Sequence, residues 1–147
     1  IVTSQAALWN IAYQPLGFVL FVVAAMGLCW LPPLDLPTAE GDLAGGIEAE
    51  YTGVRLAVLR LARMVVILAL AGATVTFYLG GWLGPWLPAW AWSGIKILIV
   101  AALMVSAGRM VPRVREARYL ELSWKLGIPL ALTNIFVVGV IALVVPI

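Results

Sequence analysis

Four long apolar segments constrain the fold of this chain more than any other feature. They cover about residues 8–31, 54–80, 90–111 and 124–145. An α-helix of about 20 mostly apolar residues crosses the roughly 30 Å of bilayer hydrocarbon, because it satisfies its own backbone hydrogen bonds. Only 11% of the 147 residues are charged, whereas a soluble domain has about 25%. We therefore predict an all-α integral membrane protein, with about four transmembrane helices in a single membrane domain over residues 1–147.

The composition also excludes several kinds of site. Histidine is absent, so the side chain that most often carries protons near pH 7 and binds metals is missing. Cys29 is the only cysteine, and it cannot form a disulfide within the chain or a multi-cysteine metal site. A net charge of +2 is too small and too scattered for a nucleic-acid-binding surface. We expect this chain to have no catalytic residue of its own, no metal ligand and no nucleic-acid partner.

The segments between the apolar stretches differ in charge. Residues 81–89 carry no charge and are rich in tryptophan, as is typical of a membrane interface. Residues 110–123 carry Arg113, Arg115 and Arg118, and cytoplasmic loops are enriched in arginine and lysine. With four crossings, this rule predicts that residues 32–53 also lie on the cytoplasmic side and that both ends of the chain lie outside.

Five of the seven acidic residues gather between the first two apolar segments. They are Asp35, Glu40, Asp42, Glu48 and Glu50. A chain this apolar does not need so many carboxylates in one segment for solubility alone, and the segment is therefore a candidate functional site. The structural alternative is that the acidic segment pairs with the basic residues 110–123, or that both segments bind lipid head groups and partner subunits.

Basic residues also lie within the predicted helices, where a charge is expensive and marks a functional site by default. Lys96 lies about six residues into the third segment. Either its long stem reaches the interface, or it needs a carboxylate or a polar cavity. Arg63 lies deeper in the second segment than Arg55 and Arg60. It is expected to need a partner such as Glu50, an acidic lipid or another subunit, unless all three arginines only anchor the helix at the interface.

Several motifs of this chain resemble those of one family. The run PLDLPTAEGDLAGG at 33–46, followed by EYTG at 50–53, is similar to the signature PFDLPEAExELVAG…EYSG of a membrane subunit of NADH-quinone oxidoreductase, or complex I. That family is called NADH dehydrogenase subunit 1. Lys96 falls where the family has a lysine. Other blocks match in the same order, namely QPLGF at 14–18, LGGW at 79–82, PRVR at 112–115 and WK at 124–125. The resemblance covers essentially the whole chain, as the C-terminal half of a protein about twice as long.

The resemblance implies a position beside a quinone-binding chamber. In the family, the acidic loop lies where the membrane arm meets the hydrophilic arm, and an iron–sulfur cluster of a neighbouring subunit reduces the quinone. The carboxylates are expected to respond to the charge of the reduced quinone and to start proton movement into the membrane arm. Clustered acids in a partly dry site have coupled, shifted pKa values, which suits such a relay. By position, the coupling residues would be Asp35, Glu40, Asp42 and Glu50, with Glu48 in the same segment.

The basic segment is implied to help assemble the complex. Arg113, Arg115 and the following Arg118 are candidates to hold the acidic segment, or the docked hydrophilic arm, in register through charge-assisted hydrogen bonds. Quinone would bind at the interface with partner subunits, and this chain alone would hold no cofactor. The expected partners are other membrane-arm subunits and the iron–sulfur and quinone-site subunits, in what we expect to be a bacterial plasma membrane.

The sequence departs from the family at several acidic positions. The family's AETNRAPFDL becomes GLCWLPPLDL, so Leu28 replaces a glutamate and Leu31 replaces an arginine. Thr38 replaces the first glutamate of PEAE, and Arg63 replaces the glutamate of AEY in the next helix. Each lost carboxylate removes a proton site, and a cation at position 63 raises the barrier to protons there.

Two other functions stay open at the level of sequence. The chain resembles the related membrane subunit of energy-converting, membrane-bound hydrogenases, which share the acidic loop and lack some of the glutamates. Alternatively, it is a structural anchor with no role in quinone or proton chemistry, which would also account for the lost acids. The preferred interpretation is a subunit of a proton-translocating NADH:quinone oxidoreductase.

Overall fold

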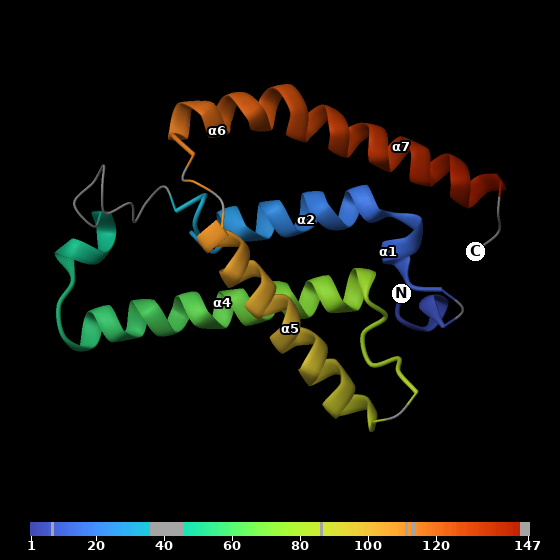
Figure 1. Ribbon diagram of the computed structural model, residues 1–147, viewed down its shortest axis with the longest axis horizontal. Coiled ribbons are helices and arrows are strands. Elements are labelled where there is room, and N and C mark those ends of the chain that lie inside the picture. Colours follow the sequence, from blue (N-terminus) through green and yellow to red (C-terminus); the bar gives the residue numbers. More distant parts are fainter. Residues whose placement is uncertain (7, 36–45, 86, 111, 113, 145–147) are drawn as a thin grey trace.

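The computed structural model is built of helices (Figure 1) and describes residues 1–6, 8–35, 46–85, 87–110, 112 and 114–144. Its α-helices are α1 (Asn10–Tyr13), α2 (Pro15–Leu28), α4 (Val54–Tyr78), α5 (Ala89–Met110), α6 (Glu116–Leu122) and α7 (Ile128–Val144). Short 3₁₀ helices cover Thr3–Gln5 (η1) and Gly46–Glu50 (η3), and a π-helical turn covers Ser123–Gly127 (η4). Helix α2 lies between α4 and the α6–α7 run, while α5 crosses α4 at a steep angle.

Three helical runs are long and apolar enough to span a membrane. They are Val54–Tyr78, Ala89–Met110 and Ala117–Ile141. The bounds of the first two agree with the second and third apolar segments of the sequence to within two residues. The predicted all-α membrane fold is therefore confirmed.

The first apolar segment differs from the expected continuous helix over residues 8–31. The backbone leaves helical geometry at Gln14, and α2 starts afresh at Pro15 and ends at Leu28. Pro15 lacks the N–H that would continue the preceding turn, and its ring disfavours the α conformation at the residue before it. The 14 residues of α2 extend over only about 21 Å at 1.5 Å per residue, so α2 is shorter than the membrane core.

The last apolar segment starts earlier than the predicted residue 124. Helix begins at Glu116, because residues 116–122 (EARYLEL) combine strong helix formers with their charges. Pro129 therefore lies inside a helical run and not near its beginning. Since a proline at 129 cannot donate to the carbonyl of Lys125, the helix widens into the π-helical turn directly before it.

The core lies where α2, α4 and α5 meet. Its most buried members include Ala71 and Val75 of α4, Val100 and Met104 of α5, and Met26 of α2. Large apolar side chains elsewhere remain exposed, among them Phe136 at 73% and Leu143 at 87%. Such surfaces suit lipid or partner helices, because they would be costly in water.

The acidic and basic segments start at the same end of the helices. Helix α5 ends against the loop that follows α2, where a Cβ at Gly108 would collide with the Pro32 carbonyl oxygen. The backbone N–H of Val114 donates to the carbonyl of Pro33 at 3.2 Å. Thus the predicted proximity of the two segments is confirmed, while the side of the membrane on which they lie remains a prediction.

Candidate functional site

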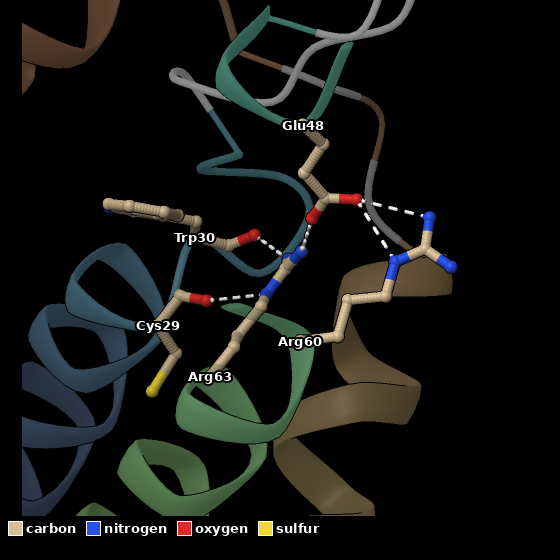
Figure 2. A network of polar contacts seen from close by, with 5 residues as sticks. All are labelled: Cys29, Trp30, Glu48, Arg60 and Arg63. Atoms are coloured by element: carbon tan, nitrogen blue, oxygen red, sulfur yellow. Dashed lines mark hydrogen bonds and ion pairs between the residues drawn. The ribbon is translucent and has the colours of Figure 1, made fainter. Parts of the chain in front are cut away.

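A carboxylate held by two arginines links the acidic segment to α4 (Figure 2). Arg63 Nη1 donates to Glu48 Oε1 at 3.3 Å, and Arg60 donates to Oε2 through both Nε and Nη2, each at 3.3 Å. The arginines lie three residues apart on α4, which places them on one face of the helix. Glu48 belongs to η3, so the pairs fix the end of the acidic segment against the start of α4.

Arg63 also caps the end of α2. Its Nε donates to the Cys29 carbonyl at 3.0 Å, and its Nη2 donates to the Trp30 carbonyl. The last carbonyls of a helix lack intrahelical partners and carry partial negative charge, so a guanidinium is favourable there. We call Glu48, Arg60, Arg63 and the carbonyls of Cys29 and Trp30 the Arg63 network. It joins α2, α4 and the acidic segment.

The carboxylate partner of Arg63 is Glu48, whereas the sequence suggested Glu50. A 3₁₀ helix has three residues per turn, so side chains two residues apart point in different directions. Glu50 is exposed and lines a shallow cleft of about 430 Å³ together with Tyr51 and Arg55. Asp35 is buried, with 5% of its surface exposed, at the end of the loop that follows α2. Glu40, Asp42 and Thr38 lie outside the described residues.

The predicted docking arginines take a different part from the one expected. Arg115 and Arg118 are exposed, and within the described part of the chain neither forms an ion pair with the acidic segment. The contact between the two segments runs through the backbone of Val114 and Pro33. Arg113 lies outside the described residues. The exposed arginines remain candidates for contacts with lipid or a partner.

Lys96 is buried at the opposite end of α4. Its Nζ donates to the carbonyls of Leu79 at 2.6 Å, Leu83 at 2.9 Å and Gly81 at 3.2 Å. The ammonium has three N–H donors, and each has an acceptor. It also lies 4.2 Å from the centre of the Trp9 ring and 5.5 Å from that of Trp92. We call this group the Lys96 cluster. Of the alternatives left open by the sequence, the structure favours a polar cavity, formed here by backbone carbonyls.

Gly80 and Gly81 make the Lys96 cluster possible. Their φ angles are +70° and +49°, which are unfavourable for residues with a Cβ. The turn aims the carbonyls on either side of these glycines at Lys96. In addition, a Cβ at Gly80 would lie only 3.0 Å from the Trp9 ring. The LGGW motif is therefore required for both the turn and the close approach of Trp9.

Sequence reasoning missed Gln5, a fully buried side chain next to the Lys96 cluster. Its Nε2 donates to the carbonyls of Thr76 at 3.0 Å and Phe77 at 3.2 Å, and its Oε1 accepts from the N–H of Gly80 at 2.9 Å. Asn10 Nδ2 also donates to Phe77, at 2.8 Å. The only signal in the sequence was that amide side chains stand beside an apolar segment, where their partners 67 to 75 residues away could not be inferred.

The chemistry available to these groups is acid–base and electrostatic. Within the described ranges, no three or more cysteine, aspartate or glutamate side chains come together in a way that could hold a metal. Cys29 is a buried free thiol. What the acidic segment offers is a fixed carboxylate, Glu48, beside a buried one, Asp35, at one end of the apolar helices.

Span-length apolar helices, a buried lysine among them and a carboxylate–arginine network at one end define a polytopic α-helical membrane protein. The chain belongs to the NADH dehydrogenase family, whose sequence model matches residues 1–139. The resemblance found in the motifs is thereby confirmed.

Curated relatives agree with this assignment, and all of them are the H-type subunit of an NADH-quinone oxidoreductase. The chain is 41% identical over 139 residues to the first such protein of Geobacter metallireducens, a match that covers 95% of this chain and 42% of the relative. It is 39% identical over 139 residues to the second one of Geobacter sulfurreducens, with the same coverage. The identity to the first one of Rhodopseudomonas palustris is 39% over 141 residues, or 96% of this chain and 44% of the relative. The chain thus spans less than half the length of these relatives, which are named as parts of an oxidoreductase.

Proposed function

We propose that this chain is part of a membrane-arm subunit of a proton-translocating NADH:quinone oxidoreductase. The family assignment and the names of the bacterial relatives support this proposal. In it, the protein lies in the bacterial plasma membrane and its acidic and basic segments face the cytoplasm. Other membrane subunits and the iron–sulfur and quinone-site subunits of the hydrophilic arm are its partners.

The observation that carries the proposal is the position of the acidic segment. Its two ends are held against the helices, through Pro33 and Val114 on one side and through Glu48 and the arginines on the other. A quinone that gains two electrons must also gain two protons. Carboxylates in a partly dry site near such a quinone would respond to its charge. We assign this response first to Asp35, the buried acid, and then to Glu40, Asp42 and Glu50.

Glu48 has a different role in this proposal. Its two oxygens already accept from two guanidinium groups, which favours the ionised carboxylate and disfavours proton transfer through it. Likewise, Arg63 occupies the position of a family glutamate but caps α2. We therefore assign the Arg63 network to positioning and not to proton transfer.

This arrangement also favours a second candidate function, a structural anchor without a role in coupling. An anchor needs the Arg63 network and the exposed apolar helix faces, but it does not need Asp35 to change its charge. The two functions differ in what happens when Asp35 is neutralised and the complex still assembles.

The test is the Asp35→Asn substitution in the complete complex. A lost acid–base group typically lowers a rate by about 10²-fold or more, so we expect a fall in quinone reduction of about that size. The matched control is Glu121→Gln, which neutralises an exposed carboxylate on α6. Quinone reduction and proton pumping that match the control, in a complex with all of its subunits, would refute the coupling role and support the anchor.

A further inference from the structure

An apolar groove of about 510 Å³ runs between α2 and the α6–η4 segment. Val19, Val22 and Met26 line it along α2, Leu34 lines it beyond the end of that helix, and Tyr119 and Leu122 line it on α6. From Met26 to Val19 the wall of the groove extends over about 10 Å, at 1.5 Å per residue. A long, narrow and aliphatic groove of this kind matches a hydrocarbon chain.

A basic hollow adjoins the groove. It has a volume of about 480 Å³ and is lined by Arg118, Glu121, Lys125 and Leu126, and it shares Leu122 with the groove. Lys125 Nζ donates to Glu121 Oε1 at 2.5 Å, so these two charges offset each other. Arg118 is exposed and adds an uncompensated positive charge to the hollow.

The surrounding sequence strengthens this positive charge. Between residues 109 and 125 there are five arginine and lysine residues and two glutamates. None of the side chains in the spanning window of Ala117–Ile141 is buried, so this run presents its surface to the surroundings. Basic clusters at the end of a membrane helix attract anionic lipids, by about 1 kcal/mol per cation.

The π-helical turn supplies a further feature of this place. Ser123 and Gly127, its first and last residues, both line the groove. A Cβ at Gly127 would meet only the Leu122 carbonyl oxygen, at 4.0 Å, so the space beside this glycine is open. Widened helical turns of this kind occur frequently at functional sites.

We propose that this groove and hollow together bind one anionic phospholipid. An acyl chain lies along α2, and the phosphate lies against Arg118 and Lys125. Charge complementarity selects an anionic lipid over a zwitterionic one and over a neutral isoprenoid tail, because neither of these brings net negative charge to the hollow. A bound lipid would fill the space between α2 and the last helix and thereby support the acidic segment, which follows Leu34.

The test uses the complete complex in nanodiscs of phosphatidylcholine, to which phosphatidylglycerol with a photoactivatable group in its acyl chain is added. After irradiation, mass spectrometry maps the labelled peptides. We expect label on α2 and α6, and we expect phosphatidylcholine with the same group to label them less. Arg118→Gln should raise the half-saturating lipid concentration about fivefold, whereas Arg55→Gln, which removes a cation at the start of α4, should not.

A second pair of variants tests the groove itself. Gly127→Leu places a side chain in the groove and should abolish labelling of α2. Gly139→Leu makes the same change on α7, where a Cβ meets nothing within 4 Å, and should leave labelling unchanged. The proposal is overturned if both lipids label equally, if no label reaches α2, or if each variant behaves as its control does.

Discussion

The Lys96 cluster and the Arg63 network each place a cation at the C-terminal end of a helix. Lys96 binds carbonyls at and beyond the end of α4, and Arg63 binds those of Cys29 and Trp30 at the end of α2. In the cluster, the partners of the cation are backbone oxygens and aromatic rings, and Lys96 is only 8% exposed. In the network, Arg63 is 25% exposed at its side chain and shares a carboxylate with Arg60.

This difference teaches which end of the molecule can respond to charge. Backbone carbonyls do not titrate, so the Lys96 cluster keeps its geometry whatever charge appears nearby. The Arg63 network contains an ionisable partner, and both arginines can exchange it for another anion. We infer that the Lys96 end is a fixed base for the helices, while the Arg63 end can adjust to a partner or to a charged substrate.

The largest effect should come from Lys96→Met, which removes all three donors from the cluster. Leu83 keeps the Trp92 indole as a donor at 2.6 Å, while the carbonyls of Leu79 and Gly81 lose the donor that Lys96 provides. A buried acceptor without a donor costs about 1–3 kcal/mol. We therefore expect the free energy of unfolding in detergent to fall by about 2–4 kcal/mol.

The matched control for this variant is Lys125→Met, because the side chain of Lys125 is 72% exposed and pairs with Glu121 on the same helix. An exposed pair of this kind contributes about 0.3–0.5 kcal/mol. If the two lysine variants unfold at the same denaturant concentration, the carbonyls around Lys96 do not stabilise the fold as the geometry indicates.

Arg63→Gln should have the next largest effect. It breaks the hydrogen bonds to two carbonyls and to Glu48, and hydrogen bonds of charged groups contribute about 1.5–3 kcal/mol. Hydrogen exchange should speed up at the amides of residues 46–50, because their side-chain anchor on α4 is lost. Arg63→Lys separates charge from shape, since an ammonium cannot reproduce the guanidinium fork. Full retention of slow exchange in Arg63→Lys would show that charge alone holds the segment.

Glu48→Gln should have a smaller effect than Arg63→Gln. The amide keeps an oxygen acceptor for one arginine but loses the ionic component of both pairs. Arg63 retains the two carbonyls of α2, so α2 and α4 stay joined. We expect a loss of about 1 kcal/mol in the free energy of unfolding. A loss as large as that of Arg63→Gln would mean that the carbonyl contacts contribute little.

The sequence predicted the membrane class, two of the helices and the neighbourhood of the charged segments, because these depend on local hydropathy and charge. It could not predict that Glu48 and not Glu50 meets Arg63, since that depends on how η3 is turned relative to α4. The carbonyl partners of Lys96 and the contacts of Gln5 were also beyond reach. Backbone oxygens carry no mark in a sequence, and these contacts join residues that are far apart along the chain.

The smallest effect should come from Arg60→Gln, because the side chain of Arg60 is 60% exposed. Water screens such a pair, which typically contributes about 0.2–1 kcal/mol. Double-mutant cycles of Glu48→Gln with Arg60→Gln and with Arg63→Gln measure the two pairings separately, since neighbouring residues do not contribute additively. The N–O distance is 3.3 Å in both pairs, so a larger coupling energy for Arg63 would come from its lower exposure. Equal coupling energies would mean that Glu48 is shared evenly, and that the Arg63 end owes its order to the carbonyls of α2 alone.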